Sequence, residues 1–380
     1  MKYAVGAAAL AAVTTGPAIA GGVERSNQSV SILFEQGTYV ELGFSRFDPD
    51  VSGSSNSSGL GSGEMAPGFS SYSLAYKQDL GENIAVALMV DEPVGADVSY
   101  SGTNNYPLGS TSPTLTLDGA NADVNSTGVT ALLKYEFPSH FSLIGGVRAI
   151  KTSGTVRLPG VFNYALDSST ETNFGYIVGV AWEKPEIAAR VALTYSSSVT
   201  HDFEAHESFN NPYTTSVVDD MTDLETEVPQ SLTLEFQTGI AADTLIFGSV
   251  RWVDWSAFNI SPEYYTGGAP NGLGLDPLVS YEHDVITYNL GLGRKFNENW
   301  SAAILVGYEK HEGTYTGNLG PTDGFRSIGL AATYTTGKVK VTGGIRYVEI
   351  GDAKTEFGPD TTRFKGNDGV GVGLRVGYYF

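Results

Sequence analysis

The sequence predicts an all-β fold, namely a transmembrane antiparallel β-barrel of fourteen strands. Composition and one local pattern support this prediction. Glycine contributes 47 residues, tyrosine 21 and phenylalanine 18, whereas charged residues make up only 17%. The final segment, Val370 to Phe380, is apolar at every second position, with small, charged or tyrosine residues between. This period-2 alternation suits a barrel strand with one face toward lipid and the other toward the lumen.

Residues 1–20 have the features of a secretory signal peptide. Lys2 precedes a short apolar run, and Ala18-Ile19-Ala20 provides a small-residue cleavage pattern. No later segment approaches the ~18 uninterrupted apolar residues that a membrane-spanning helix requires. We therefore expect an exported chain that enters a membrane only as strands, with the barrel formed by residues 38–380.

Composition and motifs argue against several classes of function. The chain has no cysteine, which excludes disulfides and thiolate metal sites, and its formal charge of −20 argues against nucleic acid as a partner. No G-x-S-x-G motif occurs, and the five histidines are scattered singly. We expect no enzyme activity, no cofactor and no metal site, although His201 and His206 in an acidic segment are a weak suggestion of metal binding.

Fourteen period-2 segments bounded by turn residues predict the strands. They lie near 38–48, 69–80, 83–92, 125–137, 140–157, 172–184, 187–200, 227–238, 243–256, 281–296, 299–312, 323–336, 338–352 and 367–380. In the strands near 187–200 and 299–312, Val191 and Ile304 would face lipid, while Arg190 and Glu309 would face the lumen.

The connections between these segments alternate strictly between tight turns and long polar loops. The long ones are residues 49–68, 93–124, 158–171, 201–226, 257–280, 313–322 and 353–366. Bacterial outer-membrane barrels combine an even strand number with short periplasmic turns and longer external loops. The pattern therefore predicts the outer membrane of a Gram-negative bacterium, with both termini in the periplasm.

One predicted external loop is strongly acidic. Residues 201–228 contain eight Asp or Glu residues and no Lys or Arg. Their carboxylates could bind divalent cations that also bridge lipopolysaccharide, but no twelve-residue calcium loop is present. Solvated loops on a cell surface are the preferred interpretation.

One motif narrows the prediction. The segment from Pro229 to Leu234, a turn, and a W-x-D-W-S-x-F core made by Trp252, Asp254, Trp255 and Phe258 resemble a signature of the FadL/TodX family of outer-membrane transporters for hydrophobic compounds. The resemblance implies a monomeric barrel whose lumen holds an N-terminal hatch, here residues 21–37. Separately, the strand Val370 to Phe380 resembles the terminal signal by which outer-membrane proteins are recognised for assembly, which implies the barrel-assembly machinery as a partner and a membrane of lipid and lipopolysaccharide.

The resemblance further implies a route for long-chain fatty acids or similar molecules. They would be captured at the external loops, pass to an interior pocket and leave sideways through the barrel wall. Because proline lacks a ladder donor and glycine is flexible, we place this exit at Asp91, Pro93 and Gly95 on the third strand. The alternative is that Pro93 merely ends a strand before a long loop.

Apolar residues in two external loops are the candidates for ligand capture, because exposed apolar side chains require an explanation. They are Leu108, Leu115 and Leu117 in the first loop, and Leu158, Val161, Phe162, Tyr164 and Leu166 in the second. Packing of loop against loop is the alternative. For a ligand carboxylate, the candidates are guanidinium groups at lumen-facing positions, which can pair with it through two hydrogen bonds. These are Arg148, Arg190, Arg346 and Arg375, and a purely structural role is the alternative for each.

Two other functions compete with fatty-acid uptake. A general diffusion porin would usually have more strands and a long inward-folded loop lined by opposed charges. A surface adhesin would use the acidic loops and would show no uptake defect on deletion. Within the family, an aromatic-hydrocarbon channel is also compatible with the sequence, so the identity of the substrate stays open.

Overall fold

The computed structural model describes residues 23–26, 28–109 and 115–380. Within these residues, fourteen strand positions form one closed antiparallel sheet, which confirms the predicted fold and strand number. The ring closes where β1 (Tyr39–Asp50) pairs along its whole length with β23 (Asp368–Tyr379). The predicted signal peptide, residues 1–20, lies outside the described part of the chain.

Three of the fourteen positions are each occupied by two consecutive segments, which are β4 with β5, β10 with β11, and β12 with β13. Between β1 and β23 the wall consists of β3 (Phe69–Asp79), β4 (Ile84–Asp91), β5 (Ala96–Ser99), β6 (Asn121–Glu136), β7 (Phe141–Leu158), β9 (Glu171–Lys184), β10 (Ala189–Ser196), β11 (Val199–Asn210), β12 (Val217–Val228), β13 (Ser231–Ala241), β14 (Thr244–Val253), β17 (Val285–Lys295), β18 (Trp300–Glu309), β19 (Phe325–Thr336) and β20 (Val339–Ile350).

Short elements occupy the N-terminal segment and the connections. They are the strands β2 (Gly53–Ser55), β8 (Tyr164–Ser168), β15 (Asn259–Ile260), β16 (Val279–Ser280), β21 (Ala353–Phe357) and β22 (Asp360–Phe364), the 3-10 helices η2 (Ser31–Phe34), η4 (Pro185–Ile187) and η5 (Trp255–Ala257), and the helix α1 (Glu263–Thr266). Among the described residues, no helix is both long and apolar enough to cross a bilayer.

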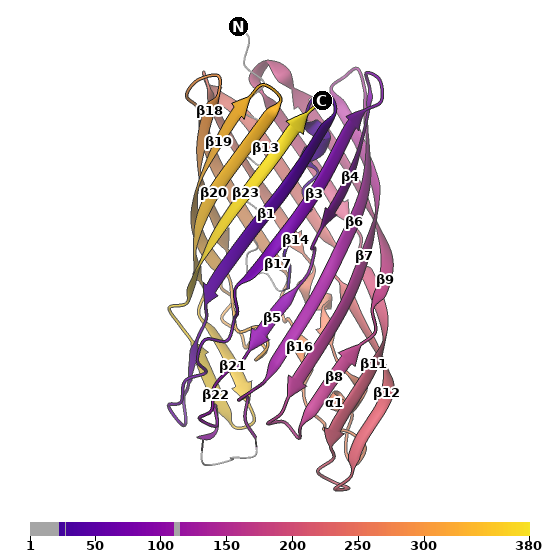
Figure 1. The fold of residues 1–380 in the computed structure, drawn as a ribbon, viewed down its shortest axis with the longest axis vertical. Helices are drawn as coiled ribbons and strands as arrows, with labels where there is room; N and C mark the ends of the chain where they lie inside the picture. The colour runs from indigo at the N-terminus through magenta and orange to yellow at the C-terminus, as the bar shows by residue number, and fades with distance from the viewer. Residues whose placement is uncertain (1–22, 27, 110–114) are drawn as a thin grey trace.

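The predicted alternation of tight and long connections is confirmed. Figure 1 shows tight turns at the end that carries the C-terminus, and β8, α1, β21 and β22 at the opposite end. Two of the tight turns place glycine in the left-handed backbone region, with φ of +87° at Gly81 and +56° at Gly337. A side chain would strain the backbone there, so these turns account for the glycines at the predicted strand ends.

The outer surface of the wall is apolar across its middle. Side chains that alternate outward along the strands are exposed, among them Leu88, Leu193, Ile304 and Leu374. Between them, Arg190 and Glu309 are buried on the inward face. Both assignments agree with the alternation of the sequence, and an exposed apolar band of this kind suits acyl chains as solvent.

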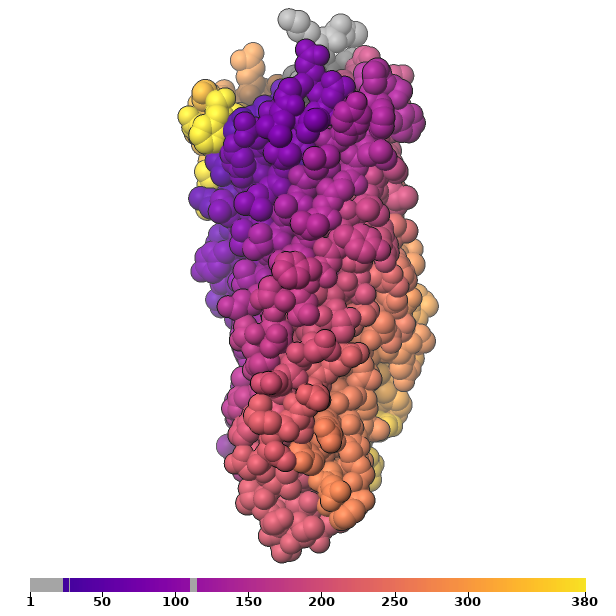
Figure 2. All heavy atoms as spheres, turned by 90° about the vertical axis from the view of Figure 1, so that its right-hand side faces the viewer, coloured from indigo at the N-terminus to yellow at the C-terminus, as the bar shows by residue number. Residues whose placement is uncertain are grey.

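One predicted loop is wrong. Residues 201–226 do not form a long irregular loop, because β11 and β12 pair in register from Val199↔Val228 to Asn210↔Val217. Phe203, Ala205 and Phe209 are buried on one face of this hairpin together with Glu207, while most of the other acidic residues occupy the opposite, more exposed face. Their acidity hid an alternation that was present in the sequence. Figure 2 shows the molecule narrowing toward the end to which this hairpin belongs.

Candidate functional site

Residues 23–26 and 28–37 lie against inward-facing side chains of the wall. η2 buries Ile32 and Leu33, and together with Val30 they belong to one apolar cluster with residues of seven wall strands. The wall residues include Ala87, Leu132, Ile144, Ile177 and Ala192. This packing removes the apolar side of the segment from water, which stabilises it inside the lumen.

Polar contacts fix the same segment around the circumference of the barrel. They join Glu24 to Arg251 (2.5 Å), Arg25 to Asp97 (2.5 Å), Ser26 to Asp91 (2.5 Å), Gln28 to Arg148 (2.6 Å), Ser29 to Glu235 (2.5 Å) and Glu35 to Lys340 (3.1 Å). Burial acts to raise the pKa of Glu35, but Lys340 and the hydrogen bond from Tyr379 outweigh it, so this pKa lies below its usual value. Glu35 therefore stays ionised near neutral pH and keeps its pair with Lys340.

The third strand position is broken at the predicted exit residues. β4 ends at Asp91 and β5 resumes at Ala96, so Pro93 interrupts a strand instead of starting a loop. The N-terminal segment pairs with this break through a bridge between Glu24 and Val94, with hydrogen bonds from Arg25 N to Pro93 O (2.9 Å) and from Gly95 N to Val23 O (2.8 Å). The chain at the break is thus held by residues 23–25.

The break leaves part of the neighbouring strand without a partner. Residues 69–73 of β3 pair with β1, but the ladder from β3 to β4 begins only at Leu74↔Val90. On the other side of the break, β5 pairs only with β6 in the described ladders. In an otherwise closed sheet, the wall between β3 and β5 therefore lacks ladder hydrogen bonds.

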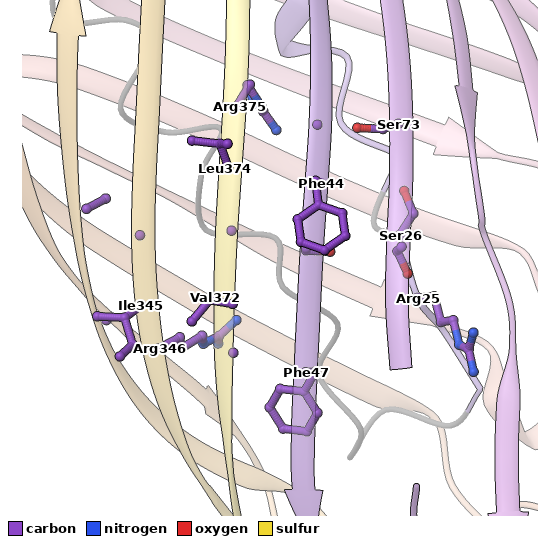
Figure 3. Close-up of a pocket in the computed structure, with 18 of the residues that line it drawn as sticks. Arg25, Ser26, Phe44, Phe47, Ser73, Ile345, Arg346, Val372, Leu374 and Arg375 are labelled. Carbon is purple, nitrogen blue, oxygen red and sulfur yellow. The ribbon is translucent and has the colours of Figure 1, made fainter. Parts of the chain in front are cut away.

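An inner cavity lies beside this gap (Figure 3). It holds about 1030 Å³ of space free of protein atoms, part of it open to solvent. Arg25 and Ser26 of the N-terminal segment and Asp91 of β4 border it. The facing wall carries small residues at inward positions, which are Gly43, Ser45, Ser71, Ser73, Gly329, Gly344, Gly371 and Gly373. These small side chains leave the lumen wide at this level. A second hollow of about 990 Å³ shares part of this lining.

The four candidate arginines divide into two pairs. Arg148 donates to Gln28 (2.6 Å), and the Arg190 guanidinium lies 4.4 Å from the ring centre of Phe34, so both hold the N-terminal segment. Arg346 and Arg375 border the inner cavity. Arg346 donates to Ser327 (2.7 Å), and Arg375 lies 3.5 Å from a Glu41 carboxylate oxygen. The predicted inward orientation is confirmed for all four, while ligand binding stays a prediction.

An outer cavity of about 640 Å³ lies on the other side of Arg25, toward the long connections. Its lining is mainly apolar and comes from the N-terminal segment, the first long connection, β5 and two later loops. It includes Val51, Met65, Phe69, Val98, Tyr281, Leu319 and Pro321. Arg25 borders both the inner and the outer cavity.

The expectation of exposed apolar loop residues is wrong for most of the set. Leu108, Leu117, Leu158, Val161, Tyr164 and Leu166 are each at most 4% exposed. All but Leu108 belong to one apolar core beneath the long connections, which is the loop-on-loop alternative. Leu115 and Phe162 are partly exposed. The same core includes Phe325 and Phe364, which are distant in the chain, and the sequence does not display this proximity.

The motif residues form a buried corner at the end of β14. Trp255 is 1% exposed and packs against Phe258, with ring centres 5.5 Å apart. Trp252 donates to Asp284 (3.1 Å), and Gln230 donates to Asp254 (2.9 Å). These contacts tie the β13–β14 pair to the following connection, a structural role.

Sequence reasoning missed Glu24, Arg25 and Arg251, which take part in two of the ion pairs of the N-terminal segment. The inward position of Arg251 could have been predicted from the sequence, because it lies two residues from Val253, which is also buried on the inward face of β14. The pairing of Arg251 with Glu24 could not have been predicted, since 227 positions separate the two residues. The two candidate histidines do not converge, because His201 bonds to backbone carbonyls and His206 bonds to Asp219. In the described residues, no group of three or more potential ligands could hold a metal ion.

No family model and no curated protein matches this chain. Solved structures do. A Pseudomonas aeruginosa FadL homologue superposes with a TM-score of 0.74 at 14% identity, covering 97% of this chain and 98% of that one. The Pseudomonas putida toluene transporter TodX superposes with a TM-score of 0.66 at 11% identity, covering 97% of this chain and 98% of that one. The Ralstonia pickettii toluene transporter TbuX superposes with a TM-score of 0.59 at 13% identity, covering 91% of this chain and 90% of that one. By its strand number, its closure and these superpositions, the chain has the barrel fold of the FadL and TodX proteins.

Proposed function

We propose that this protein is an outer-membrane channel for the uptake of hydrophobic small molecules, with long-chain fatty acids as the first candidate substrate. The molecules are captured at the external loops, enter the interior and leave sideways through the wall. Support comes from the shared barrel fold, since two of the similar structures are named as toluene transporters. An aromatic hydrocarbon is accordingly the second candidate substrate.

The observation that carries this proposal is the break between β4 and β5. A lateral exit needs a place where the closed ladder lacks hydrogen bonds, and residues 69–73 have no ladder partner facing the break. The inner cavity reaches Asp91 and Glu92 at the same place. Each methylene kept out of water is worth ~0.8 kcal/mol, so a direct route from cavity to lipid retains free energy that a watery pore would lose.

The proposed orientation follows from the connections. The C-terminus lies at the end with the tight turns (Figure 1), so we place that end in the periplasm and the long connections outside the cell. The exposed apolar band of the wall lies in the lipid of the outer membrane. We propose that the chain acts as a monomer and reaches the membrane through recognition of its C-terminal strand by the barrel-assembly machinery.

Residues 21–37 are the proposed hatch, of which residues 23–26 and 28–37 are described. Their buried apolar side chains and ionic contacts with the wall support a plug that obstructs the lumen. An obstructed lumen also disfavours a general diffusion porin, which needs an open aqueous path. Leu115 and Phe162, the partly exposed members of the loop set, are the proposed first contacts of the ligand. Arg346 and Arg375 are the proposed partners of a ligand carboxylate.

Uptake measurements test the proposal. A deletion strain carrying the wild-type gene should accumulate labelled oleate, labelled toluene or both, whereas the empty strain should not. Pro93→Val restores a ladder donor at the break, so it should slow uptake without lowering the yield of heat-modifiable barrel. Pro138→Val, in the tight turn between β6 and β7, is the matched control. Normal uptake by Pro93→Val at equal yield would refute the lateral exit.

Conductance in a planar bilayer separates the competing function. The hatched channel should pass little steady ion current, because the N-terminal segment and the loop core occupy the lumen. A large steady current from the wild-type protein would favour the porin instead. A deletion strain with unchanged uptake of both compounds would favour the adhesin.

A further inference from the structure

Arg25 occupies the boundary between the inner and outer cavities. Its side chain is 9% exposed, and one of its terminal nitrogens lies 2.5 Å from the Asp97 carboxylate. The guanidinium carbon lies 4.2 Å from the ring centre of Phe69. Asp97 belongs to β5, beyond the break, and Phe69 belongs to the edge of β3 that lacks a ladder partner. The side chain therefore bridges the two sides of the gap in the wall.

The surrounding backbone is shaped to admit this guanidinium. A Cβ atom at Gly95 would overlap the Arg25 side chain, with the guanidinium carbon only 2.6 Å away. The Arg25 amide also donates to Pro93 O (2.9 Å). The glycine that sequence analysis assigned to flexibility thus provides room for Arg25 to cross the break.

Charge favours this closed arrangement. Asp97 stands directly opposite Asp123 in the β5–β6 ladder, and like charges at opposite positions repel. The Arg25 guanidinium compensates part of this repulsion. Nearby Glu24 is already paired with Arg251, and Asp91 already accepts a hydrogen bond from Ser26. Asp97 is therefore the carboxylate that holds Arg25 in place.

Protein partners leave the guanidinium incompletely hydrogen-bonded. Its Nε is buried against Gly95 and has no hydrogen-bond partner among the described residues, while both cavities are bordered by the Arg25 side chain. A carboxylate arriving from the outer cavity can accept hydrogen bonds from the guanidinium and compete with Asp97 for it. A neutral hydrocarbon cannot make this exchange and has to wait for the Arg25–Asp97 pair to open unaided.

We propose that Arg25 is a specificity-determining residue that admits carboxylate-bearing amphiphiles from the outer to the inner cavity in preference to neutral hydrocarbons. This inference rests on the proposed uptake function. It assigns to one residue the choice between the two candidate substrate classes. Release of Arg25 from Asp97 also frees the residue that spans the gap, so passage between the cavities and loosening of the break occur together.

The test compares uptake of labelled oleate and labelled toluene by cells that carry each variant. Arg25→Met removes the charge while keeping much of the side-chain length, so toluene uptake should rise about tenfold relative to oleate, the equivalent of ~1.4 kcal/mol. Arg25→Lys keeps the charge but loses the planar fork, and should give an intermediate ratio. Arg46→Met is the matched control, because Arg46 pairs with Asp48 at the same 2.5 Å but on the exposed outer face.

The outcomes separate the two proposals. If the wild-type protein takes up neither compound, the proposed function fails. If it takes up at least one, but Arg25→Met leaves the ratio unchanged at equal barrel yield, or Arg46→Met changes it equally, the role of Arg25 is refuted. Should Arg25→Met fail to assemble, Asp97→Asn weakens the same pair from the wall side. It should shift the ratio in the same direction, and an unchanged ratio would again refute the inference.

Discussion

Phe34 should control how firmly the N-terminal segment is held in the lumen. Its ring stands between two cations of the wall, with Lys134 Nζ 4.7 Å and the Arg190 guanidinium carbon 4.4 Å from the ring centre. Cation–π contacts are worth ~0.5–1 kcal/mol when exposed and ~2 kcal/mol when desolvated. Two partly buried contacts therefore contribute about 2 kcal/mol, so Phe34→Ala should favour local opening of η2 by roughly 30-fold.

Hydrogen exchange measures this opening directly. The amides of Leu33 and Glu35 donate to the carbonyls of Val30 (3.0 Å) and Ile32 (3.1 Å), so they exchange only when this turn opens. Both should exchange roughly 30-fold faster in Phe34→Ala. Phe34→Leu keeps apolar volume but removes the π face, and should be intermediate. Lys134 retains its pair with Glu183 (3.2 Å) in either variant. Exchange rates that match wild type would refute the role of the two Phe34 cation–π contacts as an anchor.

Three further perturbations test other parts of the structure. Glu207→Leu removes a fully buried carboxylate that accepts hydrogen bonds from Tyr164 and other donors. The outer loops should therefore lose about 3 kcal/mol of stability and be cleaved faster in limited proteolysis. Unchanged cleavage would contradict this. Gly373→Leu should fill the inner cavity and lower uptake at unchanged barrel yield, whereas Gly373→Ala should be tolerated, since its Cβ would meet nothing closer than 3.9 Å. Arg251→Met should release Glu24 and raise the ion current in planar bilayers, and a current equal to wild type would count against this anchor.

The wall of this barrel could be predicted because its signal is local. Alternation over ten or so residues specifies which side chains face lipid, and it does so for Leu193 and Arg190 without knowledge of their neighbours. The same alternation ran through residues 199–228, where acidic residues on the exposed face led to a loop prediction in place of the β11–β12 hairpin. A break at Pro93 was also foreseeable, since proline cannot donate to a ladder.

The sequence by itself determined the strands of the antiparallel wall, the alternation of turns and loops, and the inward orientation of the arginines, because each depends on residues close together in the chain. The tertiary structure alone decided that Arg148 and Arg190 hold the N-terminal segment while Arg346 and Arg375 border a cavity. It also decided that the apolar loop residues pack together, and that Arg25 crosses the break to Asp97. The contacts of Arg25, Arg148 and Arg190 join residues 72 or more positions apart. Only closure of the ring brings such residues within reach of one another.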